Sequence, residues 1–182
     1  KEVYNMVKLK KYLCACCNFG SVISCGNYGL IFKYEDNFTG ANQGNSEAIL
    51  QMLFKRGGMG LGSSYPNWCA PPQSETIIVR AGGAYGFNQP TQDILNAYPV
   101  GDLRKDASVG VGFTTADKIF INALYIKLYV NQDPGEGGND SDADWSVLRY
   151  SNVLLMCAEA LNESNNGLTP DAYTDINLVR AM

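Results

Sequence analysis

The stretch Asp144–Glu163, which reads DWSVLRYSNVLLMCAEALNE, constrains the fold more than any other part of the chain. It opens as a short strand, in which Trp145 and Val147 lead into Arg149. From Tyr150 onward, apolar residues recur at steps of four, three and four. These residues are Tyr150, Leu154, Cys157 and Leu161. Residues at this spacing lie on one face of a helix, so the sequence predicts a strand followed by an amphipathic helix.

A second helix is expected directly afterwards. Asn165–Thr169 reads as a loop, Thr169 can cap a helix, and Pro170 suits the first helical position. The apolar stripe then continues at Ala172, Ile176 and Val179. A connection this short joins antiparallel neighbours. One such hairpin cannot bury its apolar face alone, so it must pack on Glu2–Cys25, on helices outside this sequence, or on both.

The same residues carry a family resemblance. The string W-x-V-L-R-Y-x-x-V-L-L-M-x-A-E-A-L-N-E, followed by I-N-x-V-R-A, resembles the C-terminal signature of the SusD/RagB family. Departures from the usual form occur at Ser151, Asn152 and Cys157. Two earlier phrases are also similar to the family: N-S-E-x-I-L from Asn45 and P-T-x-x-L-x-x-Y from Pro90. The resemblance identifies a family, and it does not identify a ligand.

The resemblance implies a mainly α fold of the SusD type, with tetratricopeptide-type helix pairs and an irregular, loop-rich lobe that contains short strands. Within one such domain we assign residues 1–25 to a helical scaffold, 26–144 to the loop-rich ligand-binding lobe, and 145–182 to the C-terminal hairpin. Family members are longer, and both ends of this sequence fall inside helical patterns. We therefore expect a central to C-terminal piece that is incomplete at both ends.

The remaining elements are predicted from local patterns. A helix is expected over Glu2–Asn18, continuing to Cys25, and another from Pro90 to Ala97. Runs rich in β-branched and aromatic residues predict strands at Ala48–Phe54, Ala107–Phe113 and Ile119–Val130, and a short β-like run within Ile77–Gly86. Lys55–Ser74 is predicted to be one long irregular loop.

Composition excludes several classes of function. A net charge of −4 argues against a nucleic-acid partner, which requires a basic surface. The chain has no histidine, which removes Ser-His-Asp and Cys-His catalysis. Cys14, Cys16 and Cys17 lack zinc spacing and are taken as small apolar residues of a helix face. We therefore expect no cofactor, no metal site and no catalytic residue.

An acidic segment and an aspartate–arginine turn offer less specific signals. Asp140, Asp142 and Asp144 alternate as at the start of a calcium loop, but Trp145 stands where that loop requires glycine. A solvated acidic loop is the expectation. Asp102 and Asp106 flank Arg104 and are expected to satisfy it, in preference to forming a pair for glycoside hydrolysis.

The candidate ligand site lies in the loops. A loop of this length inside a compact domain is usually functional or disordered, and Lys55–Ser74 carries one of the two tryptophans of the chain. Neutral sugars present apolar faces that match flat rings, and their hydroxyls match amides. The predicted ligand contacts are Tyr65, Asn67, Trp68, Tyr85 and Phe87, with further amides at Asn88 and Gln89. The alternative that these rings belong to the core stays open.

The signature also contains charged residues that need partners if they are buried. We predict that Arg149, Glu159 and Arg180 share hydrogen bonds that fix the hairpin. Glu47 is expected to bond backbone N–H groups at a turn before its strand.

The resemblance implies a lipoprotein of the outer face of the outer membrane, anchored upstream of Lys1. Such a protein partners a SusC-type, TonB-dependent barrel transporter and captures oligosaccharides or peptides for it, without covalent chemistry. Two other readings remain: a helical-repeat scaffold for protein partners and a carbohydrate-active enzyme.

Overall fold

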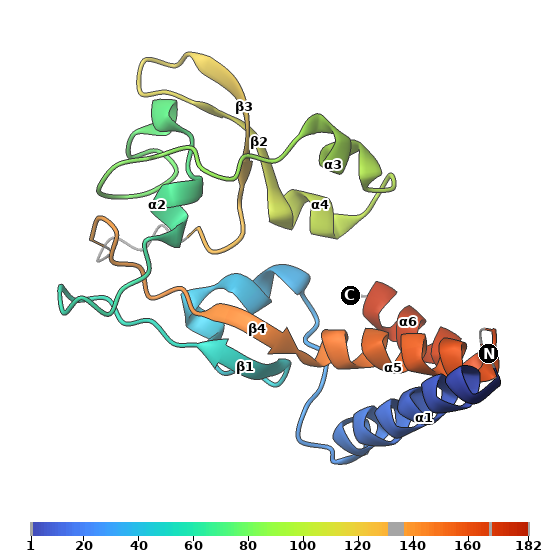
Figure 1. Ribbon diagram of the computed structural model, residues 1–182. Helices are drawn as coiled ribbons and strands as arrows, with labels where there is room; N and C mark the ends of the chain where they lie inside the picture. Colours follow the sequence, from blue (N-terminus) through green and yellow to red (C-terminus); the bar gives the residue numbers. More distant parts are fainter. Residues whose placement is uncertain (1, 131–136, 168, 182) are drawn as a thin grey trace. The chain divides into compact units, whose positions relative to one another are not determined.

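The structure is a computed structural model that describes residues 2–130, 137–167 and 169–181 (Figure 1). It divides into two compact units. The helical unit comprises Lys1–Lys33, Gly44–Gln51 and Ser146–Met182, and the loop-rich unit comprises Tyr34–Gln43 and Met52–Trp145. The helical unit therefore joins both ends of the sequence with one short central segment.

The helical unit is built from α1 (Glu2–Ser24), α5 (Tyr150–Asn165) and α6 (Pro170–Arg180). α5 packs against both α1 and α6 (Figure 1). The predicted apolar face is buried: Leu154 is 0% exposed and Cys157 is 6% exposed. Across the hairpin, Ala172 of α6 is also fully buried. The expected helix pair is confirmed. The start of α6 is capped, because the Ala172 N–H donates to Thr169 Oγ1 at 3.2 Å.

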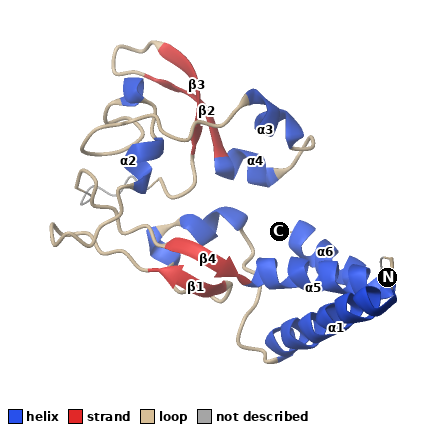
Figure 2. Cartoon of the chain, in the orientation of Figure 1, coloured by secondary structure: helices blue, strands red, loops and turns tan. Residues whose placement is uncertain are grey.

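A small sheet leads into α5. β4 (Trp145–Arg149) pairs with β1 (Ala48–Met52) in a two-stranded sheet, so both predicted strands form (Figure 2). On one face of this sheet the Gln51 amide donates to Ser146 Oγ at 3.3 Å. The strand-to-helix change at Tyr150 lies where the sequence predicts it.

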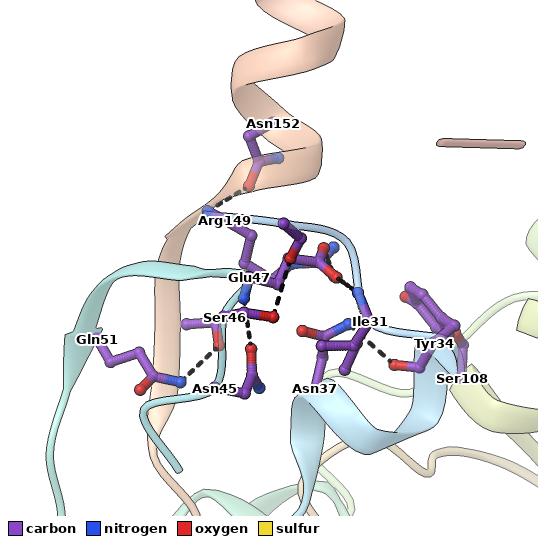
Figure 3. Close-up of polar contacts among 12 residues, drawn as sticks. Ile31, Tyr34, Asn37, Asn45, Ser46, Glu47, Gln51, Ser108, Arg149 and Asn152 are labelled. Carbon is purple, nitrogen blue, oxygen red and sulfur yellow. Dashed lines mark hydrogen bonds and ion pairs between the residues drawn. The ribbon is translucent and has the colours of Figure 1, made fainter. Parts of the chain in front are cut away.

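A buried ion pair joins the sheet to the start of α5 (Figure 3). Glu47 is 0% exposed, and its Oε1 lies 3.1 Å from the Arg149 guanidinium. Its Oε2 accepts the Ile31 N–H at 3.4 Å, and its carbonyl accepts the Tyr150 N–H at 2.7 Å. One glutamate thus ties three segments of the helical unit together.

This pair bears on the predicted charge cluster of Arg149, Glu159 and Arg180. Arg149 pairs with Glu47, which precedes it by 102 positions. Glu159 lies on the exposed side of α5, and Arg180 ends α6. The partner was expected within the hairpin, whereas Glu47 directly precedes β1. Shared hydrogen bonds among Arg149, Glu159 and Arg180 stay a prediction.

The departures from the family string have local roles. Asn152 Oδ1 accepts the Arg149 N–H at 2.9 Å, as a residue three positions into a helix commonly does. The Cys157 thiol is hydrogen-bonded to Asp175 of α6, and burial raises the pKa of Cys157 to about 12. Ser151 is buried, and its hydroxyl has no hydrogen-bond partner within the described part of the chain.

The loop-rich unit contains an antiparallel pair, β2 (Val109–Thr114) and β3 (Phe120–Ile126), as predicted. Its register shifts between Val111 and Phe113, where Gly112 has φ +75° and a Cβ atom would lie 2.3 Å from the Phe120 ring. The core beneath the pair consists of Ala70, Ile78, Val79 and Phe113.

Short helices make up much of the rest of this unit (Figure 2). They are η1 (Tyr34–Phe38), η2 (Gly40–Asn42), α2 (Tyr65–Cys69), η3 (Pro72–Ser74), α3 (Gln92–Ala97) and α4 (Leu103–Ser108). α3 confirms the helix expected before Tyr98, whereas α2 and η3 lie inside the stretch predicted to be irregular.

Two sequence expectations for this unit are wrong. Ile77–Gly86 forms bends and turns rather than a strand, although Ile78 and Val79 are buried in the core. The apolar residues Ile77, Ile78 and Val79 indicated burial in the core, and they did not indicate pairing in a sheet. α2 was missed although Pro66 occupies its first turn, a position that favours helix initiation.

The cysteines of α1 pack only in part as expected, because Cys16 is half-buried whereas Cys14 and Cys17 are exposed. No helix within the described residues has the length and apolar character needed to span a membrane.

Candidate functional site

The candidate site is built on α2 and on the segment 85–87, which returns to it. Three main-chain N–H groups of that segment donate to α2 and its end: Tyr85 to Asn67 at 3.0 Å, Gly86 to Ala70 at 2.8 Å and Phe87 to Trp68 at 2.7 Å. The last carbonyls of a helix have no partner inside it. The returning segment supplies these partners, so a short helix and a loop become one rigid support.

Three aromatic side chains stand exposed on this support, and we call them the aromatic platform: Trp68, Tyr85 and Phe87. Their exposed fractions are 49%, 45% and 58%, respectively. The rings of Tyr85 and Phe87 are stacked, with centroids 6.0 Å apart and planes at 21°. Gly86 between them has φ +70°, and a Cβ atom there would lie 2.7 Å from Pro72 Cδ. The two rings are therefore held in place by a position that only glycine fits.

Two amide side chains border the platform. Asn88 and Gln89 are exposed, and the Gln89 amide donates to the Cys69 carbonyl at 3.1 Å. This bond fixes the Gln89 side chain while leaving its oxygen available as an acceptor. Rings with adjoining amides can bind a ligand that has an apolar face and a hydroxylated edge.

Asn67 has a different role from the predicted one. It is 3% exposed, and its amide donates to the carbonyls of Ala81 and Gly83, each at 2.8 Å. Its Oδ1 accepts the Asn139 N–H at 3.1 Å. An amide this fully used inside the protein fixes loops and has no group to offer a ligand. We therefore remove Asn67 from the ligand contacts and treat it as support for the platform.

Tyr65 is likewise a packed residue rather than a free ring. Its ring meets Trp145 edge-on at 4.8 Å between centroids and Tyr129 at 5.7 Å, and Tyr129 stacks on Trp145 at 5.1 Å. Burial, together with a hydrogen bond to Cys69, raises the pKa of the Tyr65 hydroxyl. Tyr65 is half-buried and packed on neighbouring rings, whereas the rings of the platform are exposed. A ligand contact at Tyr65 stays a prediction.

The alternating aspartates hold a glycine-rich loop, which corrects the expectation of a solvated acidic loop. Asp140 Oδ2 accepts the N–H groups of Gly57 and Gly58, each at 2.8 Å. Asp144 is 6% exposed, and its Oδ1 accepts the Phe54 N–H at 2.7 Å. Within the described residues, no group of three or more cysteine or acidic side chains is arranged to hold a metal ion.

The surroundings of Asp140 and Asp144 shift the pKa values of these carboxyl groups in opposite directions. The N–H groups of Gly57 and Gly58 lower the pKa of Asp140 because they stabilise its charged form. Burial raises the pKa of Asp144, and the Phe54 N–H only partly opposes this effect. The sequence showed the spacing of these acids but not their main-chain partners.

The prediction that Asp102 and Asp106 satisfy Arg104 is confirmed for Asp102 alone. Two bonds connect the side chains, at 2.8 Å and 2.6 Å, and Asp102 also caps α4 by accepting the Arg104 N–H. The bonds from Arg104 lower the pKa of Asp102. A general acid for glycoside hydrolysis requires the opposite shift.

Comparisons with known proteins agree with this architecture. The SusD family model matches residues 118–181. A SusD superfamily protein of Parabacteroides distasonis superposes with a TM-score of 0.81 at 23% identity, over 94% of this chain and 38% of its own. Surface glycan-binding protein A of Bacteroides thetaiotaomicron gives a TM-score of 0.78 at 18% identity, over 98% and 44% of the two chains. No curated protein matches the sequence.

A further solved structure shows this Bacteroides thetaiotaomicron protein in complex with laminarihexaose, with a TM-score of 0.77 at 19% identity over 98% and 44% of the two chains. The chain thus spans less than half the length of these solved structures. The sequence match lies in the C-terminal third, whereas the structural match extends over nearly all of the chain. The predicted fold is therefore confirmed: the chain has the fold of these SusD-type structures, and residues 118–181 match the SusD family model.

Proposed function

We propose that the protein binds an oligosaccharide at the bacterial cell surface and delivers it to a SusC-type, TonB-dependent transporter. The observation that carries this proposal is the aromatic platform of Trp68, Tyr85 and Phe87, exposed on a hydrogen-bonded support. The laminarihexaose complex of a protein with the same fold supports the choice of ligand class.

The chemistry of the platform suits a neutral sugar chain. The stacked rings of Tyr85 and Phe87 offer apolar faces to the C–H surfaces of pyranose rings. Gln89, two residues after Phe87, is exposed and keeps its amide oxygen for a hydroxyl. Asn88 is also exposed, and its side chain bonds the Tyr65 hydroxyl. Exposed rings of this size lose contact with water when a sugar stacks on them, which supplies much of the binding free energy.

The partner and location belong to the same proposal. A protein of this kind is lipid-anchored on the outer face of the outer membrane and hands its ligand to the barrel without changing it covalently. We expect the barrel transporter to co-purify with the protein from its native membrane. Intact cells should also bind an antibody against it. Recovery of the protein only from broken cells contradicts the surface location.

Titration calorimetry against laminarihexaose, followed by other oligosaccharides and peptides, tests the ligand class. Trp68→Ala should weaken oligosaccharide binding by about tenfold, because it removes stacking worth roughly 1.5 kcal/mol. Tyr85→Ala and Phe87→Ala should each weaken it as well. The matched control is Tyr173→Ala, which removes a ring that is 52% exposed on α6 in the helical unit.

The outcomes separate the readings that the sequence left open. Binding that is unchanged in Trp68→Ala and Tyr85→Ala places the site elsewhere and overturns the platform. If no glycan or peptide binds the intact protein, the scaffold reading replaces this one. Release of reducing sugar that is lost in Asp102→Asn identifies an enzyme instead.

A further inference from the structure

The loop-rich unit also contains a pocket that lies apart from the aromatic platform. It is a pocket of about 430 Å³ between η1, the β2–β3 pair and the segment that follows β3. Ligand pockets commonly begin at roughly 300 Å³. No residue of the platform lines it. The pocket is therefore a separate candidate site.

Aromatic rings form much of its wall: Phe38, Phe113, Tyr125 and Tyr129. Tyr125 stands opposite Gly110 in the strand pair, and a Cβ atom on Gly110 would lie 2.1 Å from the Tyr125 ring. The ring therefore lies flat over the main chain of its neighbour. Burial raises the pKa of the Tyr125 hydroxyl, so it remains a neutral phenol.

Tyr129 is held in an unusual backbone conformation. Its φ is +65°, in the left-handed region that bulky residues rarely adopt. Its ring is fixed by Phe38 on one side, at 5.2 Å between centroids, and by Trp145 on the other. Strained residues persist where the surrounding structure enforces them, and they concentrate at ligand sites.

Two carboxylates and one ammonium group also line the pocket. Glu35 and Asp36 come from the first turn of η1, and within the described part of the chain neither carboxylate forms an ion pair. The ammonium of Lys127 is already bound, since it donates to the Asp106 carbonyl at 2.9 Å. The pocket thus has an acidic excess beside aromatic walls.

We propose that this pocket binds a small organic cation, an ammonium group on an apolar body. The ring faces attract a cation through their quadrupoles, and Glu35 and Asp36 supply the opposite charge. The methyl groups of a quaternary ammonium fill the apolar space that a metal ion could not use. This site is independent of the oligosaccharide proposed for the platform.

Choline and its uncharged isostere, in which carbon replaces the quaternary nitrogen, form the first test. The two probes share size and shape, so their difference measures charge alone. Calorimetry should show choline binding about tenfold more tightly than the isostere. In amide spectra, choline should shift the signals of residues 35–39 and 125–130 and leave Trp68 unchanged. Equal binding of the two probes, or shifts confined to the platform, overturns the proposal.

Charge variants form the second test. Glu35→Gln combined with Asp36→Asn should weaken choline binding by about tenfold. The control is Asp93→Asn combined with Asp117→Asn, which removes the same charge from two exposed positions outside the pocket. Unchanged binding in the first double variant, or equal loss in the control, contradicts the site.

Lys127→Gln gives a result of opposite sign. Removing the one ammonium of the pocket should tighten choline binding about threefold, because a like charge is lost. Weaker binding in this variant points to an anionic or zwitterionic ligand and overturns the cation. Trp68→Ala should leave choline binding intact, so this proposal and the platform fail or succeed separately.

Discussion

The helical unit and the loop-rich unit hold their chains in place by different means. In the helical unit, apolar residues at helical spacing pack between helices, and Leu154 and Ala172 are completely buried. In the loop-rich unit, polar side chains bond main-chain groups far away in sequence. The Asn67 side chain accepts the N–H of Asn139, 72 positions away, and the Asp144 side chain accepts the N–H of Phe54, 90 positions away. Apart from the contacts of Glu47, the helical unit depends mainly on the burial of apolar side chains, whereas the loop-rich unit adds several long-range hydrogen bonds to its small core.

The largest effect is expected from the ion pair of Glu47 and Arg149 in the helical unit. Glu47→Ala should lower the free energy of unfolding by about 3 kcal/mol, because it removes a fully buried carboxylate that lies 3.1 Å from the mostly buried Arg149 guanidinium. Urea unfolding measures this change. Glu159→Ala is the matched control and should stay within about 0.5 kcal/mol, since Glu159 is exposed. Equal losses in both variants restore the charge cluster predicted from the sequence.

This comparison also explains what the sequence could predict. The helices and the strand before them follow from the spacing of residues such as Leu154 and Ala172, because packing of regular elements repeats at a fixed period. The family string then identified the fold to which they belong. The partner of Arg149 could not be predicted, because Glu47 is remote in sequence and no period relates the two.

The candidate site was predictable only in part. The sequence named Trp68, Tyr85 and Phe87 as rings for a ligand, and the structure places all three at the surface of one support. It could not distinguish them from Tyr65, which packs against Trp145, or from the buried Asn67. Exposure of an aromatic residue in a loop depends on distant contacts, and local composition does not report these.

In the loop-rich unit, Asn67→Ala should produce a moderate loss. It leaves the carbonyls of Ala81 and Gly83 and the N–H of Asn139 without their amide partner, at a cost of about 1–3 kcal/mol. Thermal unfolding gives the loss, and hydrogen exchange should show that residues 81–87 open first. Asn122→Ala removes an exposed amide of β3 and should have little effect. Unchanged protection at 81–87 contradicts the supporting role of Asn67.

Acid should destabilise the loop-rich unit, because two of its carboxyl groups have lowered pKa values. The pKa values of Asp102 and Asp140 lie below the unfolded value of about 3.9. Their contribution to stability is therefore complete above that pH and is lost as the pH falls through the folded values. Asp144 acts in the opposite sense, because its raised pKa makes stability decline as the pH rises above about 4.

Variants separate these two pH windows. Asp140→Asn should reduce the loss of unfolding free energy below about pH 4. Asp144→Asn should reduce the loss of unfolding free energy above about pH 4. Chemical unfolding at a series of pH values measures both limbs. If Asp140→Asn changes only the limb above pH 4, the bonds from Gly57 and Gly58 are not the source of its acid dependence.

The smallest expected effect is a gain in the helical unit. Ser151 buries a hydroxyl that lacks a partner within the described part of the chain. Ser151→Ala should raise the free energy of unfolding by about 0.5–1.5 kcal/mol, since it removes an unsatisfied polar group and improves helix propensity. Ser164→Ala is the control on the same helix, where the Ser164 hydroxyl donates to the Leu161 carbonyl at 3.0 Å. Ser164→Ala gains the same helix propensity but loses this hydrogen bond. The difference between the two variants therefore isolates the effect of the buried Ser151 hydroxyl. A smaller gain at Ser151 than at Ser164 means that the Ser151 hydroxyl has a water or protein partner. In that case water or a polar group reaches the packed interior of the helical unit.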